Sequence, residues 1–123
     1  MYEGSSAENK KLQLEITRLL HGLGMPSHIK GYRYIREGIR LVYKNEVTYK
    51  ASNLYTRVAD IFGTTSSRVE KSIRYAIEIS WNRANWDLME EIFGYSVDVN
   101  KSKPTNSEYI MTIVDRLSLT YMN

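Results

Sequence analysis

The chain has 123 residues, which is the length of one domain with a single hydrophobic core. Hydrophobic residues make up 42% of it and the formal net charge is +3, so it is neither intrinsically disordered nor strongly basic, and no apolar run reaches the length of a membrane span. Because there are no cysteines, disulfides, thiol nucleophiles and cysteine-based zinc sites are excluded.

Hydrophobic periodicity predicts two helices in the first part of the chain. Residues 1–11 are polar and lack periodicity, so we expect a linker or an artificial end there and a folded domain over residues 12–123. The first helix is predicted from about Lys11 to Gly22, and the second from about Ser27 to Asn45. Their apolar faces carry Leu12, Ile16, Leu19, Leu20 and Leu23 in the first helix, and Tyr32, Ile35, Ile39 and Val42 in the second.

The next two helices, about Asn53–Phe62 and Ser66–Arg83, are joined by a short turn and predict a helix-turn-helix. The small residue Ala59 lies four positions before Gly63, and the apolar Val69 lies six positions after it. A small side chain lets the two helices cross closely, and glycine takes the backbone through the turn. The second helix of such a motif is the one that enters the major groove of DNA.

This second helix has one apolar and one polar face. Val69, Ile73, Ala76, Ile77 and Ser80 share the apolar face, with Trp81 at its edge. Ser66 and Ser67 are N-cap candidates, and Ser67, Arg68, Glu70 and Lys71 in the first two turns can reach phosphates or base edges. The alternative is a solvated face on which Glu70 and Arg74 form an i,i+4 ion pair.

Two more helices complete the predicted fold. A short helix at about Asp87–Phe93 has a start that resembles a capping box at Asp87, and an extended polar loop follows it, with Val97 and Val99 as possible strand-like contacts. The last helix opens with a capping box at residues 105–108, and its apolar face carries Ile110, Ile113, Val114, Leu117 and Tyr121. The sequence therefore predicts an all-α, six-helix bundle that contains a helix-turn-helix.

Signs of catalysis or of a cofactor are absent from the sequence. His21 and His28 have no clustered carboxylates beside them, which argues against a metal site, and Gly22 and Gly24 lack the third glycine of a dinucleotide-binding loop. Most of the ten tyrosines and two tryptophans fall on apolar helix faces, so core packing explains them better than stacking on single-stranded nucleic acid. We expect a cytoplasmic protein that is no enzyme and needs no cofactor.

Charge is distributed unevenly along the chain. Between Ser27 and Lys50 there are six Lys or Arg residues and two glutamates, whereas residues 86–99 contain four acidic residues and no basic one. The first region is suited to phosphate and the second to a basic partner.

Several residue strings become recognisable together. They are Ile29-Lys30-Gly31-Tyr32 followed by Tyr34, Arg36 and Glu37; Ser67-Arg68-Val69-Glu70; Ile73-Arg74 with Ala76-Ile77-Glu78; Phe93-Gly94-Tyr95; and Lys103-Pro104-Thr105-Asn106-Ser107-Glu108. From about Leu12 to Leu119, the chain resembles the C-terminal DNA-binding effector domain of the sporulation master response regulator of endospore-forming Firmicutes.

The resemblance implies a helical domain that binds short promoter boxes, activates or represses transcription and contacts the sigma subunit of RNA polymerase. It also implies a phosphoacceptor receiver domain joined through a linker, and a possible homodimer on tandem boxes. Arg68 and Glu70 match base-reading positions of the family. Lys71 stands where the family has arginine, and lysine lacks the planar fork that binds guanine O6 and N7 together. Thr56 stands where proline is usual.

The expected function is therefore sequence-specific binding of double-stranded promoter DNA. The expected site residues are Arg68, Glu70 and Lys71 for base reading; Thr65, Ser67, Arg74, Lys30 and Arg40 for phosphate or edge contacts; and Asp87, Glu90 and Glu91 for the sigma subunit. The alternative is a helical protein-interaction module that has kept this fold but lost specific DNA recognition.

Overall fold

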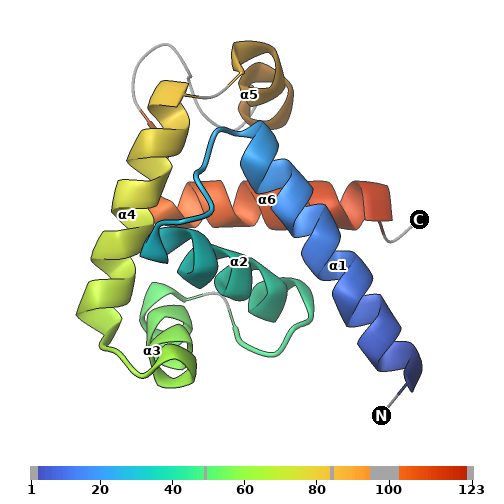
Figure 1. The fold of residues 1–123 in the computed structure, drawn as a ribbon, viewed down its shortest axis with the longest axis vertical. Coiled ribbons are helices and arrows are strands. Elements are labelled where there is room, and N and C mark those ends of the chain that lie inside the picture. Colours follow the sequence, from blue (N-terminus) through green and yellow to red (C-terminus); the bar gives the residue numbers. More distant parts are fainter. Residues whose placement is uncertain (1–2, 49, 84, 95–102, 122–123) are drawn as a thin grey trace.

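The structure, a computed structural model, describes residues 3–48, 50–83, 85–94 and 103–121, and of residues 3–6, 51, 52 and 121 it describes the backbone alone (Figure 1). The described residues form helices and connections without any strand, which confirms the all-α, six-helix prediction. The helices are α1 (Glu3–Gly22), α2 (Lys30–Tyr43), α3 (Ala51–Phe62), α4 (Ser66–Arg83), α5 (Trp86–Phe93) and α6 (Asn106–Tyr121). None of the helices in these described ranges is long and apolar enough to span a membrane.

The helix bounds agree with the prediction at α4 and differ most at α1. Helix α1 begins at Glu3 rather than near Lys11, so the segment expected to be a linker is helical in its backbone. Extending an existing helix avoids the cost of nucleation, so a polar stretch can join it without a periodic apolar face. Helix α2 begins three residues later than predicted, and it ends at Tyr43 because Asn45 adopts a left-handed conformation with φ of 59°.

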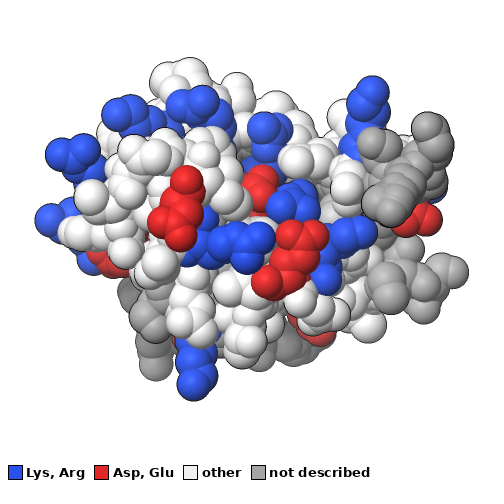
Figure 2. All heavy atoms as spheres, turned by 90° about the horizontal axis from the view of Figure 1, so that it is seen from below, with Lys and Arg blue, Asp and Glu red and all other residues white. Residues whose placement is uncertain are grey.

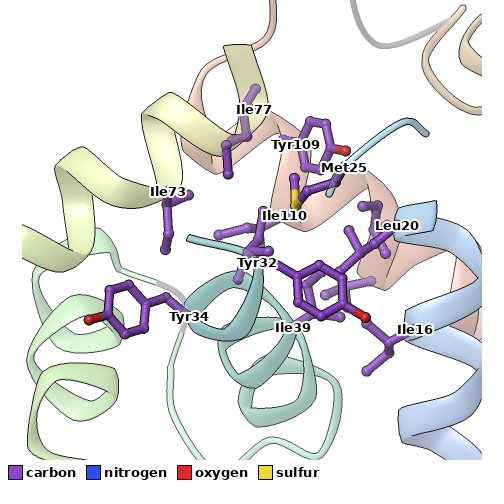
Figure 3. Packing of buried hydrophobic residues seen from close by; sticks show 14 of the residues in the cluster. Ile16, Leu20, Met25, Tyr32, Tyr34, Ile39, Ile73, Ile77, Tyr109 and Ile110 are labelled. Atoms are coloured by element: carbon purple, nitrogen blue, oxygen red, sulfur yellow. The ribbon is translucent and has the colours of Figure 1, made fainter. Parts of the chain in front are cut away.

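Helix α2 is the centre of the bundle and packs against α1, α3, α4 and α6. Figure 3 shows its Tyr32 and Ile39 beside Ile16 and Leu20 of α1 and Ile110 of α6. The predicted apolar faces are buried, except that Leu19 is only partly buried and the side chain of Tyr121 lies outside the described part. Each fully buried leucine or isoleucine contributes about 1.5–3 kcal/mol, so this core is the main source of stability.

Glycine lets α2 cross very close to α4. A Cβ atom on Gly31 would overlap the backbone carbonyl oxygen of Ser72 and lie 2.8 Å from the Cβ of Ala76. The close approach brings the start of α2 beside the middle of α4.

The starts of the last two helices are held by side-chain caps. The predicted capping box of α6 is confirmed, because Thr105 Oγ1 accepts from the Glu108 N–H at 3.1 Å and Glu108 Oε1 accepts from the Thr105 N–H at 2.9 Å. The predicted cap of α5 at Asp87 was wrong by two residues, because the N-cap is Asn85, and the helix begins at Trp86, one residue before the predicted start. Asparagine caps as well as aspartate, so the preference for Asp87 had no energetic basis over Asn85. The expected contacts of Val97 and Val99 lie outside the described residues.

Candidate nucleic-acid interface

Helices α3 and α4 pack against each other around a three-residue turn, as the sequence predicted. Gly63 has a left-handed φ of 67°, and the Thr64 N–H donates to the Ala59 carbonyl oxygen at 3.0 Å. Val58, Ala59 and Val69 are buried between the helices. This is the geometry of a helix-turn-helix, in which α4 is the second helix.

The N-cap of α4 is Thr65, and the prediction of Ser66 or Ser67 was wrong. Thr65 Oγ1 accepts from the Arg68 N–H at 3.2 Å, whereas Ser66 and Ser67 are the first two residues of the helix. Three hydroxyl residues in a row make the cap ambiguous in sequence, since serine and threonine cap almost equally well. The Thr65 hydroxyl accepts in this bond, so its own proton can be donated to a phosphate oxygen.

The predicted base-reading residues lie on the first two turns of α4. Arg68 and Lys71 are exposed, as are Ser67 and Arg74. Glu70 is only 32% exposed in its side chain, and its Oε2 accepts from Arg74 Nη1 at 2.8 Å. The ion pair that the solvated-face alternative required is therefore present. An exposed i,i+4 pair contributes only about 0.3–0.5 kcal/mol, so either partner can leave it for DNA.

Two hollows border the exposed strip of α4 that is formed by Ser67, Arg68, Lys71 and Arg74. One, of about 410 Å³, is lined by Ile29, Lys30 and Gly31 of the α2 start and by Lys71, Ser72 and Tyr75 of α4. The other, of about 370 Å³, is lined by Tyr55 of α3, by Glu70, Arg74 and Ile77 of α4 and by residues 103–107 at the start of α6. The strip is therefore a ridge with a hollow and a lysine on each side. A ridge of this kind fits a groove between two phosphate backbones.

Lys30 and Arg40, the two residues expected to contact the DNA backbone from α2, are in different surroundings. Lys30 is exposed beside Lys71. Arg40 lies near the other end of α2, with its side chain only 16% exposed, and it forms ion pairs with Glu37 at 2.6 Å and Glu46 at 3.3 Å. The hydrogen bond to Glu37 raises the pKa of Arg40 above its usual value. The structure thus brings Lys30, but not Arg40, to the exposed side of α4.

Lys103 is a basic residue at this surface that the sequence analysis missed. It is exposed and lines the same hollow as Arg74. Lys103 belongs to one of the strings that carry the family resemblance, but its place beside α4 could not be predicted, because the packing of α6 against α4 cannot be read from the sequence. Figure 2 shows the lower face of the molecule as it is oriented in Figure 1, and on this lower face acidic groups lie directly beside basic ones. The charge of the lower face is therefore mixed rather than uniformly positive.

The acidic helix α5 lies at the end of α4 that is remote from the turn (Figure 1). Asp87, Glu90 and Glu91 are all exposed. Glu91 forms an ion pair with Arg116 of α6. The acidic surface is therefore at the opposite end of α4 from the predicted base-reading residues, and one of its three carboxylates is already paired.

The two histidines line a hollow at the α1–α2 connection, together with Arg83 at the far end of α4, and not beside the first turns of α4. The His21 ring stacks on Tyr32 with ring centroids 5.7 Å apart, and His28 is exposed in the same hollow as His21. Within the described ranges, no three His, Cys, Asp or Glu side chains cluster so as to hold a metal ion.

Comparison with known families matches the chain to a family model that spans the whole site. The family model described as "Sporulation initiation factor Spo0A C terminal" matches residues 16–117. The matched range contains the helix-turn-helix, both hollows and the acidic helix. It agrees with the resemblance found in the sequence.

Proposed function

Because the chain belongs to the Spo0A C-terminal family, the DNA-binding part of a sporulation-initiation transcription factor, we propose that the first two turns of α4 read specific promoter boxes. The observation that most directly supports this proposal is that Arg68 and Lys71 are exposed at the start of the second helix of a helix-turn-helix. This family consists of DNA-binding regulators rather than enzymes. The proposed ligand is chromosomal promoter DNA, so the proposed location is the cytoplasm.

Each base-reading residue has a chemical role in this proposal. The Arg68 guanidinium donates two parallel hydrogen bonds to guanine O6 and N7. The Glu70 carboxylate accepts from a cytosine amino group after Arg74 has turned from it toward a phosphate. Lys71 provides a compact ammonium group with freely rotating donors rather than a rigid planar fork, so it tolerates more than one base.

The two hollows support a duplex rather than a single strand as the ligand. The backbones that border a major groove would pass on either side of the ridge. Lys30 lies on one side, and Arg74 and Lys103 lie on the other. Thr65 and Ser67 add hydroxyl donors at the start of α4. We assign the backbone contact from α2 to Lys30, because Arg40 would first have to leave Glu37 and Glu46.

A gel-shift comparison tests this function. The 123-residue protein is titrated onto a promoter box of the family and onto a scrambled duplex at physiological salt and at two further salt concentrations. We expect the box to bind more tightly by a factor on the order of 10³, the low end of the range for specific complexes, because one small module contacts a short site. Both affinities should fall steeply with salt as counterions are released. Equal affinity for both duplexes would favour the protein-interaction module instead.

A second part of the proposal concerns the acidic surface formed by Asp87, Glu90 and Glu91. Its remote position on α5 leaves it accessible while α4 occupies DNA. Carboxylates at such a rim govern encounter and choice of a basic partner. We assign this surface to the sigma subunit of RNA polymerase, and we expect two copies of the domain to occupy tandem boxes as a homodimer.

A further inference from the structure

One side-chain amide connects three helices beside the base-reading turn. Asn106, the first residue of α6, donates from Nδ2 to Tyr55 Oη of α3 at 2.9 Å and to the Glu70 backbone carbonyl oxygen of α4 at 3.2 Å. An amide nitrogen carries two protons, so the two acceptors use its full donor capacity. The contact joins residues that are 36 and 51 positions apart in the chain.

The bond to α4 reaches the backbone rather than a side chain. The Glu70 carbonyl accepts an N–H within α4 and has a second lone pair for Asn106. Glu70 lies between Arg68 and Lys71 in α4. A restraint on the Glu70 carbonyl therefore also restrains the turn that carries the Arg68 and Lys71 side chains. Asn106 is itself held, because the capping box of Thr105 and Glu108 fixes the start of α6.

We propose that Asn106 is a positioning residue for sequence reading, which fixes the α4 backbone at Glu70 with Tyr55 as its second anchor. The inference rests on the proposed function of α4 and adds how its specificity is maintained. Paired donors must meet O6 and N7 of one base in a fixed geometry, whereas a lysine can follow a phosphate through its flexible chain. Loss of the tether should therefore weaken discrimination between sequences more than it weakens binding to DNA in general.

Three variants test the tether. Asn106→Ala removes both bonds, and Asn106→Asp keeps the shape but places an oxygen in place of the donor. Tyr55→Phe removes only the second anchor. Ser80→Ala is the matched control, because it deletes two buried hydrogen bonds of α4, to Leu23 and to Tyr109, ten residues beyond Glu70 and away from the reading turn. Circular dichroism confirms that each variant is folded at the assay temperature.

The readout is the ratio of the scrambled-duplex Kd to the box Kd. We expect Asn106→Ala and Asn106→Asp to lower this ratio roughly threefold to tenfold, the size of one or two neutral hydrogen bonds. The scrambled-duplex Kd should change less than about twofold with Asn106→Ala, whereas the added carboxylate of Asn106→Asp should weaken binding to both duplexes as well. Ser80→Ala should lower the Tm and leave the ratio unchanged. In the Asn106→Ala background, Tyr55→Phe should have no further effect on the ratio, because Tyr55 acts through Asn106.

The possible outcomes separate the two hypotheses. If the wild-type protein discriminates but Asn106→Ala leaves the ratio unchanged, or weakens box and scrambled binding equally, the tether is only structural and the inference is wrong. If the wild-type ratio is itself near one, the proposed base reading fails, and the inference fails with it.

Discussion

The phenol oxygen of Tyr109 in α6 and the hydroxyl oxygen of Ser80 in α4 lie 2.8 Å apart in the interior of the bundle. Ser80 donates its only proton to the backbone carbonyl of Leu23 at 2.6 Å, so Tyr109 must be the donor to Ser80. This chain of two bonds joins α4 and α6 to the α1–α2 connection. It requires the neutral phenol, because a phenolate has no proton to donate.

Alkaline pH should therefore destabilise the fold. Burial raises the pKa of Tyr109 well above its ordinary value near 10. The pKa of Tyr109 is higher in the folded than in the unfolded protein. The contribution of Tyr109 to the free energy of unfolding is therefore fully present below about pH 10 and is lost as the pH rises further. We expect the free energy of unfolding in urea to fall by up to about 1.4 kcal/mol per pH unit above pH 10.

Tyr109→Phe is the variant that tests this assignment. It should be less stable at pH 8, because Ser80 loses its donor, but its stability should depend less on pH between 10 and 11.5. Burial also raises the pKa of Tyr55, so Tyr55→Phe should reduce the pH dependence in the same direction. An unchanged alkaline slope in Tyr109→Phe would show that other groups cause it.

A pair of glycine variants tests the close crossing of α2 and α4. Gly31→Ala places a Cβ against the Ser72 carbonyl, a backbone atom that can yield only if the helices separate. We expect a loss of about 1–3 kcal/mol, as for an overpacked core. Gly38→Ala is the control in the same helix, because its Cβ would lie 3.6 Å from the nearest atom of Leu54, an ordinary contact distance. Replacing glycine by alanine inside a helix should stabilise the protein by about 0.5–1 kcal/mol. Thermal denaturation should move the two Tm values in opposite directions, and a Gly31→Ala protein as stable as the parent would contradict the described crossing.

Local patterns in the sequence were sufficient for the helices and their buried faces. The bounds of α4, the turn at Gly63 and the capping box of α6 each depend on a few neighbouring residues. The contacts that shape the site, in contrast, depend on residues that are far apart in the sequence. Periodicity indicates which face of a helix is buried but not which helix covers it, so the contact of Asn106 with Glu70 could not be predicted from it. The pairing of Arg40 with Glu46 was missed because it depends on where the chain turns after α2.

Arg68→Ala should separate base reading from phosphate binding. Loss of a guanine contact should cost about 1–3 kcal/mol on the box and relax the preference at one base pair, with little effect on scrambled DNA. Arg40→Ala is the matched control, because Arg40 is held by Glu37 and Glu46 and any effect on DNA should be small and equal for all sequences. Gel shifts over a set of single-base box variants provide the measurement. Equal weakening of all duplexes by Arg68→Ala would contradict its base-reading role.

Lys71→Arg should tighten binding at one base pair. If Lys71 faces a guanine, arginine supplies the second parallel hydrogen bond, a gain of about 1 kcal/mol that is confined to boxes with guanine at that position. Lys30→Arg provides the comparison, because a phosphate contact should respond equally in every sequence. The same box variants serve as the assay. No change with Lys71→Arg would place Lys71 against the backbone or in solvent.

Charge reversal on α5 should separate activation from DNA binding. Glu91 is paired with Arg116, so Glu91→Lys would place two cations together and disturb the packing of α5 against α6. The charge is therefore reversed at Asp87 and Glu90, and Glu91 is left unchanged. The Asp87→Lys, Glu90→Lys variant should fold normally and bind the box as tightly as the parent or slightly more tightly, because its overall charge is more positive. Activation measured by transcription in vitro at a promoter that requires polymerase contact should be lost, since a basic partner would now meet lysines. Repression by occlusion should remain. Should activation persist at the parental level, these carboxylates only solvate the helix, and the polymerase is contacted elsewhere.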